Sequence, residues 1–306
     1  MSEHDNEHSG QNSTARPQWL TFLETRMEEE RDELASETLY YEIVRDMLLA
    51  ESDPDKAIAQ AIQRFYDNYA TEYPKEFNTY MQEPPEYGAG YILNSISVIV
   101  FDTIAKMPFT DPKQDVLSGF LIGITKGAAK EFDEQDPKFV CYLWGLQAAA
   151  TERWNWNRVD SMSSDREGPI VDEIIDLWLS TSALIAKLFK AGLLGEEGPR
   201  WISHDFERAF KTNTRGDVTK HPIRQAQILG TAIYVLIAGE AFAKEAKTTS
   251  EKRHYELNAE KWKFWASKLQ EVAQVVGEDA LGNLKQKAQE AHDKMVELYP
   301  EAFNSE

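Results

Sequence analysis

The chain contains 306 residues, of which 42% are hydrophobic, and 52 acidic residues outnumber 33 basic ones to give a net charge of -19. This amount of apolar surface can offset the entropy lost on folding, so intrinsic disorder of the whole chain is excluded. The negative charge repels the phosphate backbone of nucleic acids, and we therefore expect no nucleic-acid partner.

The charge is unevenly distributed along the chain. Residues 1–150 contain 27 acidic and 12 basic side chains, whereas residues 151–306 contain 25 and 21. A partner attracted to the first half by its charge should therefore be basic. The alternative is that the acidic surface only keeps the protein soluble.

The single cysteine, Cys141, excludes an intramolecular disulfide and any metal cage built from several cysteines. It lies in the apolar run Phe139 to Trp144, where a thiol is typical of an inert core residue rather than of a nucleophile. These observations fit a reducing compartment. They predict a cytoplasmic protein, with a nuclear location left open.

The first predicted segment in chain order is a disordered acidic tail over residues 1–16, because this segment is polar and lacks the apolar core of a targeting sequence. From residue 17 onward, apolar residues recur at helical spacing, and helix-breaking residues fall between the apolar runs. The predicted helices cover residues 17–33, 36–50 with Ser36 as N-cap, 54–70, 89–106, 112–131, 138–156, 169–192, 199–211, 222–247, 251–275 and 278–298. The pattern indicates an all-α fold, either an irregular multi-helix bundle or a non-repeating superhelix of antiparallel helical hairpins.

Residues 17–300 are predicted to form one helical domain, and the loop-like segment 157–168 is the best candidate for a boundary between two subdomains. The uncharged apolar stretches Tyr87 to Phe101 and Gln225 to Gly239 span 15 residues each. Crossing a bilayer takes about 20 residues. Both stretches are therefore predicted to be buried helices, and no membrane span is expected.

The clearest candidate for metal chemistry is the run Asp172-Glu173-Ile174-Ile175-Asp176, which is similar to the aspartate-rich metal motif of class I terpenoid synthases. Helical geometry places Asp172 and Asp176 about 100–140° from the centre of the apolar face, so they point to solvent or to a flank. The helix dipole already explains acidic residues in a first turn. Because the partner motif for a second metal set is also missing from the later helices, we assign no metal site here.

Other catalytic signatures are missing from the sequence. A di-iron bundle needs two Glu-x-x-His motifs, and only one is present, from Glu251 to His254. There is no zinc-binding histidine pair, nucleophile elbow, phosphate-binding loop or dinucleotide-binding glycine motif. The sequence thus predicts no catalytic residue, no metal ligand and no cofactor.

Three charged residues next to apolar runs could mark a binding pocket. They are Glu152, Arg153 and Glu240. If they are buried, each needs a charged or hydrogen-bonding partner, because an unpaired buried charge is costly. They predict either a polar pocket or ion pairs between helices.

The tryptophans could also mark a binding pocket. Seven of them lie in or beside predicted helices, where they would either line a ligand-binding cage or act as packing anchors: Trp144, Trp154, Trp156, Trp178, Trp201, Trp262 and Trp265. Trp262 and Trp265 are spaced i, i+3 and share a helix face, as core residues do.

A set of packing residues spread over much of the chain carries a family resemblance. Its elements are Asp111-Pro112 with Gln114 and Leu117, Trp144 followed by Glu152-Arg153-Trp154, Ala226 with Gly230 and Gly239, Trp262 with Trp265, and Ala288 with Ala291 and Met295. With these residues the chain resembles fungal proteins that carry the domain of unknown function 3632. The resemblance implies a fungal source and a helical fold, and it implies no activity and no functional residues.

Two functions fit these observations. The first is a cytoplasmic helical protein-interaction module, in which the acidic first half or a groove between helical hairpins engages a protein partner. The alternative is an enzyme or carrier that binds a small apolar molecule in an aromatic-lined helical pocket, which requires a cavity of roughly 300 Å³ or more. The oligomeric state is left open.

Overall fold

A computed structural model describes residues 16–33, 36–51, 53–72, 86–131, 137–156, 169–248 and 253–304. The predicted acidic tail, apart from Arg16, lies outside these residues, and so does the predicted subdomain boundary at 157–168. The side chain of Cys141 is also outside the described part.

The first half of the chain forms helices from the segments in which apolar residues recur at helical spacing. They are α1 (Gln18–Glu29), α2 (Thr38–Leu49), α3 (Pro54–Glu72), α5 (Glu86–Ile104), α6 (Lys113–Glu131) and α7 (Pro137–Trp156). Proline at the start of α3 and α7 suits the first helical turn, where the missing N–H would have no intrahelical partner.

The second half is also helical. Its α-helices are α8 (Pro169–Lys190), α9 (Glu197–Glu207), α10 (Pro222–Lys247), α11 (Ala259–Val275) and α12 (Leu284–Leu298). Shorter turns join or end them: a π-helical turn at Arg208–Thr212 and 3-10 turns at Leu281–Asn283 and Pro300–Phe303. The regular elements in the described ranges are all helical, which confirms the predicted all-α class.

Several predicted helix starts differ from the structure. The N-cap of α2 is Glu37, and Ser36 instead accepts the N–H of Thr38 with its Oγ atom at 3.2 Å. The helix predicted at 251–275 begins at Ala259, because the Asn258 side chain accepts the N–H of Lys261 at 2.9 Å and caps the first turn.

The last predicted helix also begins later than expected. The α-helical part of the segment predicted at 278–298 starts at Leu284. Gly282 and Asn283 just before it have φ values of 57° and 58°. These left-handed conformations cannot continue an α-helix.

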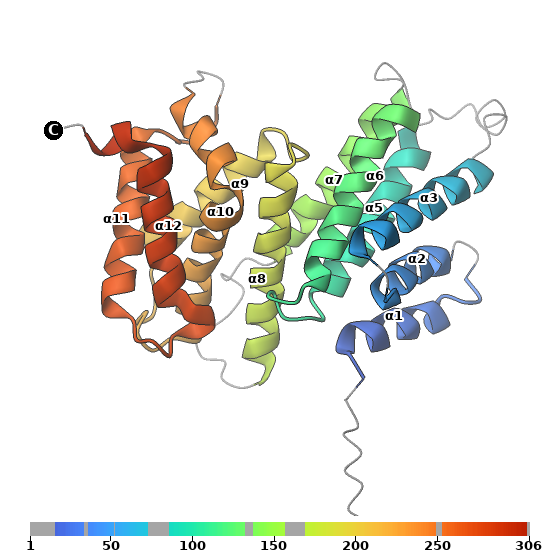
Figure 1. The fold of residues 1–306 in the computed structure, drawn as a ribbon, viewed down its shortest axis with the longest axis horizontal. Helices are drawn as coiled ribbons and strands as arrows, with labels where there is room; N and C mark the ends of the chain where they lie inside the picture. Colours follow the sequence, from blue (N-terminus) through green and yellow to red (C-terminus); the bar gives the residue numbers. More distant parts are fainter. Residues whose placement is uncertain are drawn as a thin grey trace, which may run out of the picture.

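Several of the helices that pack most extensively against each other are not neighbours in the sequence. α5 packs on α7, α3 on α6, and α10 on both α8 and α12, whereas α11 and α12 form a hairpin of consecutive helices. α8 stands between the group α1–α7 and the group α9–α12 (Figure 1). This arrangement makes α8 and α10 the central pair, and residues from both meet inside the protein.

The α3–α6 pair approaches closely because glycines on α6 face large side chains on α3. A Cβ atom added to Gly119 would lie 2.9 Å from Cδ1 of Ile58, and one added to Gly123 would lie 2.2 Å from Cδ1 of Ile62. Both distances are shorter than ordinary van der Waals contact. The side chains of α3 therefore fill space that only glycine leaves open.

The longest helix, α10, runs through the interior. It is the one helix of the described chain that is long and apolar enough to cross a membrane by length and composition, but 78% of its most apolar window is buried inside the protein. This burial is typical of a core helix and confirms that the stretch Gln225 to Gly239 is buried. The helix bends at Ala238, near which the Nζ atom of Lys294 donates to the carbonyl oxygen of Leu236 at 2.9 Å.

Candidate functional site

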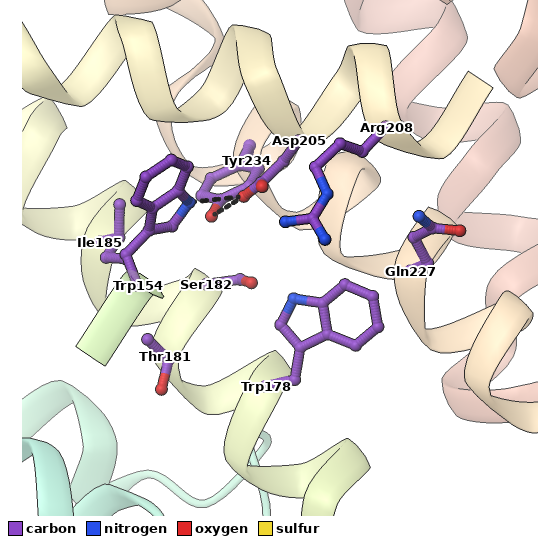
Figure 2. A pocket seen from close by; sticks show the side chains of 9 residues that line it. All are labelled: Trp154, Trp178, Thr181, Ser182, Ile185, Asp205, Arg208, Gln227 and Tyr234. Carbon is purple, nitrogen blue, oxygen red and sulfur yellow. Dashed lines mark hydrogen bonds between the residues drawn. The ribbon is translucent and has the colours of Figure 1, made fainter. Parts of the chain in front are cut away.

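Four helices and a π-helical turn bring polar side chains together inside the second half of the chain (Figure 2). Trp154 comes from α7, Ser182 from α8, Asp205 from α9 and Tyr234 from α10. Arg208 is the first residue of the π-helical turn that follows α9, and it is buried. π-helical turns are uncommon and often occur at functional sites. We call this group, together with Trp178, Thr181 and Gln227, the polar cluster.

Asp205 is the hydrogen-bonding centre of the polar cluster. Its Oδ2 atom accepts the Nε1–H of Trp154 at 3.1 Å and the hydroxyl of Tyr234 at 2.9 Å (Figure 2). Burial raises the pKa of Tyr234 well above its ordinary value, and the negative charge of Asp205 raises it further. Tyr234 is therefore a neutral hydrogen-bond donor across the physiological pH range.

The cavity inside the polar cluster is small. Its volume is about 20 Å³, which holds one water molecule, since about 10–15 Å³ measured in this way is enough for one. The guanidinium of Arg208 and the indole nitrogen of Trp178 face each other across the centre of the cluster (Figure 2). With a carboxylate, a guanidinium and several hydroxyls around it, the space suits a water that both donates and accepts hydrogen bonds.

The aromatic rings next to the cluster are tightly stacked. Trp154 stacks on Trp201 with ring centroids 5.4 Å apart and an angle of 18° between the ring planes. Farther along, Trp265 stacks against Phe206 at 4.8 Å, and Phe242 lies 5.5 Å from Trp262. These rings pack against one another and are buried, as expected of packing anchors.

The structure separates most of the six residues named from the sequence. Of these six, only Trp154 lines the cavity of the polar cluster, together with Trp178, another of the tryptophans named from the sequence. Trp262 and Trp265 are fully buried in the aromatic packing, and Trp262 donates its Nε1–H to the carbonyl oxygen of Met295 at 2.9 Å.

The three predicted charged residues lie elsewhere. Arg153 forms an ion pair with Asp102 of α5, with its Nη2 atom 2.8 Å from Oδ1. Burial raises the pKa of Asp102 more than Arg153 and Lys106 lower it. Glu152 and Glu240 are exposed to solvent. Arg153 thus joins two helices, while the two glutamates face outward.

The aspartate-rich run of α8 faces a different hollow, with a volume of about 340 Å³. Asp172 is exposed and Asp176 is half-buried there, close to Lys106. Burial raises the pKa of Asp176, and the neighbouring charge of Asp172 raises it further. In the described part of the chain, no group of three or more His, Cys, Asp or Glu side chains is placed to hold a metal ion.

A second candidate site is an open groove between α2, α3 and the start of α6, called here the α2–α3–α6 groove. Its volume is about 590 Å³, which lies in the usual range of about 300–1,000 Å³ for binding pockets. Apolar side chains dominate its lining, namely Met47, Leu48, Ala57, Ile58, Pro112 and Val116. Leu49, the next residue along α2, is 48% exposed.

The charged residues of this groove are mainly acidic. Asp55, Asp111 and Asp115 line it, with Lys113 as the one basic lining residue. The Nζ atom of Lys113 donates to the carbonyl oxygen of Leu48 and lies 5.3 Å from the centre of the Trp19 ring. The lysine ammonium is therefore already engaged by the last turn of α2, and Lys113 itself is half-buried.

The family comparison places the chain among proteins without an assigned role. A model of the family described as Protein of unknown function (DUF3632) matches residues 98–269, more than half of the chain. The chain belongs to the DUF3632 family. The comparisons found no curated protein and no solved structure that matches it. In this DUF3632 protein, the polar cluster lies wholly inside the matched region, whereas the α2–α3–α6 groove lies across its start, because α2 and α3 precede residue 98.

Sequence reasoning did not single out Asp205, Arg208 or Tyr234. Asp205 and Arg208 are ordinary charged residues of a short amphipathic segment, and Tyr234 lies in the middle of an apolar run. The one local signal is that Asp205 and Arg208 are spaced i, i+3 and so share a helix face. Nothing local shows that this face turns inward.

Proposed function

We propose that this DUF3632 protein is a helical protein-interaction module that receives a segment of its partner in the α2–α3–α6 groove. The observation that supports the proposal is the combination of an open groove of about 590 Å³ with a mostly apolar lining. Binding sites on proteins are typically concave and lined mainly by apolar side chains, with a few polar groups. We place this activity in the cytoplasm, and the cytoplasmic location and a fungal source stay predictions from the sequence.

The shape of the groove favours a protein segment over a small molecule. It is open along one side, between the end of α2 and the first turns of α3 and α6. Enclosed pockets usually surround most of a small ligand. A partly open groove with a mainly apolar lining suits side chains from another protein.

The alternative function, a carrier or enzyme for a small apolar molecule, remains a prediction. It requires a pocket large enough for the ligand, and the cavity of the polar cluster is the place to look for one among the tryptophans. The cavity beside Trp154 and Trp178 has a volume of about 20 Å³, which is far below the roughly 300 Å³ of a ligand pocket. A small apolar molecule could enter there only if α7, α8 and α10 moved apart. The groove requires no such movement.

The proposal is tested by selecting peptides from a random display library on the full chain and measuring their affinities by fluorescence anisotropy. Ala50 lines the groove, is exposed and has an extended backbone, so Ala50→Trp fills the groove without disturbing the core. Gln274→Trp is the matched control, because Gln274 is exposed on α11, at the other end of the molecule (Figure 1).

We expect selected peptides to lose at least about tenfold in affinity on the Ala50→Trp variant, or about 1.4 kcal/mol, and to keep their affinity on Gln274→Trp. A selection that yields no binder, or only binders that ignore Ala50→Trp, would overturn the proposed function.

A further inference from the structure

The charged residues around the α2–α3–α6 groove indicate what kind of partner it binds. Asp55 is exposed in the first turn of α3 and makes no ion pair within the described residues. Asp115 is 77% exposed, and one of its oxygens lies 2.6 Å from Nζ of Lys187. Asp111 uses one oxygen to accept the N–H of Lys113 at 2.9 Å and keeps the other. All three therefore have carboxylate oxygens available to a partner.

The exposed connection before α3 adds further negative charge. Glu51 and Asp53 lie there and are exposed. Lys56 is exposed on α3 but does not line the groove. Lys113 is the one basic residue of the lining, and it is already held by the carbonyl oxygen of Leu48, so the lining keeps an excess of carboxylates.

The backbone around the groove limits the conformation of the partner. The lining residues belong to α2, α3 and α6 or to the ends of these helices. Inside a helix the backbone N–H and C=O groups are paired, and only isolated groups at the helix ends stay free, which do not form the continuous row that a strand edge presents. The groove thus offers no strand edge for an extended partner to join, and side chains must provide the contacts. A helix that presents apolar residues at i, i+3, i+4 and i+7 is the segment that meets such a groove with side chains alone.

From these observations we propose that the occupant of the α2–α3–α6 groove is a basic amphipathic helix of a partner protein. Its apolar stripe packs on Ile58, Pro112 and Val116, and its lysines or arginines pair with Asp55 and Asp115. The inference rests on the proposed function, which it makes more specific. Carboxylates at the rim repel anionic lipid headgroups, so a membrane surface is not the occupant that these charges select.

The test uses two designed probe peptides of about 15 residues, long enough to form a helix. Both carry the same leucine stripe. The first has lysines on its flanks, and the second has glutamates at the same positions. Binding to the full chain is measured by fluorescence anisotropy, and Ala50→Trp reports whether each peptide occupies the groove.

We expect the lysine peptide to bind at least about tenfold more tightly than the glutamate peptide. Its affinity should fall when the salt concentration rises from about 0.1 M to about 1 M, because the Debye length shortens from about 10 Å to about 3 Å. The double variant Asp55→Lys, Asp115→Lys should reverse the preference between the two peptides. Asp293→Lys, at an exposed position on α12, is the control and should leave the preference unchanged.

The outcomes separate this inference from the proposed function. Equal binding of both peptides, with loss on Ala50→Trp, would contradict the basic partner and still support an interaction groove. Tighter binding of the glutamate peptide would likewise overturn the inference. If neither peptide binds but a hydrophobic dye does, and Ala50→Trp displaces the dye, the occupant is a small apolar molecule and both proposals fail. The peptide comparison on the wild-type chain stays decisive even if the double variant does not fold.

Discussion

The hydroxyl of Tyr234 on α10 donates a hydrogen bond of 2.9 Å to the Oδ2 atom of Asp205 on α9, in the interior of the second half of the chain. The same oxygen accepts the indole N–H of Trp154 from α7. One carboxylate thus holds together three helices that are far apart in the sequence. Asp205 is half-buried. Because a carboxylate that has lost part of its hydration needs such donors, removing either one should be costly.

Replacing Tyr234 by phenylalanine should destabilise the protein by about 1–3 kcal/mol, because the ring is kept and the carboxylate of Asp205 loses a buried donor. Urea denaturation followed by circular dichroism measures the change in the free energy of unfolding. Tyr255→Phe is the control, because Tyr255 is only half-buried, and its substitution should change stability by less than about 0.5 kcal/mol. Equal changes in stability for the two variants would show that the hydrogen bond from Tyr234 to Asp205 does not stabilise the protein.

The raised pKa of Tyr234 also predicts a loss of stability in alkali. The folded state keeps its proton above pH 10, whereas the unfolded chain releases it near the ordinary tyrosine pKa of about 10. The stabilising contribution is therefore complete below about pH 10 and is lost above it, by up to about 1.4 kcal/mol per pH unit.

The check is to measure urea unfolding midpoints between about pH 9 and pH 11 for the wild-type protein and Tyr234→Phe. Lysine titration affects both proteins alike, so only the difference between their curves reports on Tyr234. That difference should shrink as the pH rises. A constant difference across the range would contradict the assignment.

The helices were predictable because each one buries an apolar stripe, and a stripe is a local pattern. Their starts were less predictable. The start of α11 depends on a hydrogen bond from Lys261 to the Asn258 side chain, and the start of α12 depends on two left-handed residues, Gly282 and Asn283. The charged residues before both starts suit a helix equally well, so local pattern alone did not separate helix from loop.

The sites depend on which faces the helices turn toward one another, and this information is not local. Of the polar cluster, only Trp154 and Trp178 were named from the sequence, because tryptophans in apolar helices stand out as possible ligand contacts. Asp205 and Arg208 carry no such mark, and they reach the interior because α9 and its π-helical turn pack against α8 and α10. The α2–α3–α6 groove is harder still to predict. Its three helices have ordinary sequences, and the groove stays open only because no other described helix packs over it.

Replacing glycine by alanine should have opposite effects on stability at two positions, Gly230 and Gly123. A Cβ atom on Gly230 of α10 would meet Oγ of Ser182 at 3.5 Å, an ordinary contact, and alanine favours a helix over glycine by about 0.5–1 kcal/mol. Gly230→Ala should therefore stabilise the protein by about that amount. A Cβ atom on Gly123 would lie 2.2 Å from Cδ1 of Ile62, and relieving such overpacking usually costs about 1–3 kcal/mol.

Gly123→Ala should therefore lose the helical gain and destabilise the protein. The free energies of unfolding in urea give the sign for each variant. Combining Gly123→Ala with Ile62→Val, which removes the contacting Cδ1 atom, should recover part of the loss. If the two single variants were equally stable, the close approach of α3 and α6 would be wrong.

Gln225 should control the stability of two loops at once. Its Nε2 atom donates to the carbonyl oxygen of Val218 at 2.9 Å, and its Oε1 atom accepts the N–H of Leu281 at 3.0 Å. The residue is buried on α10, so Gln225→Leu leaves both backbone groups without this partner while keeping a side chain of similar size. Each unpaired buried group costs about 1–3 kcal/mol, so the loss of stability should reach about 2 kcal/mol or more.

Hydrogen exchange measured by mass spectrometry distinguishes this local role from general packing. In Gln225→Leu, peptides that cover residues 214–221 and 277–284 should exchange faster than in the wild-type protein, while peptides from α3 and α6 should not change. Gln286→Leu, at an exposed position on α12, should leave both loops unchanged. Faster exchange spread evenly over the whole chain would mean that Gln225 acts through the core as a whole, because losing a link between two loops opens those loops first.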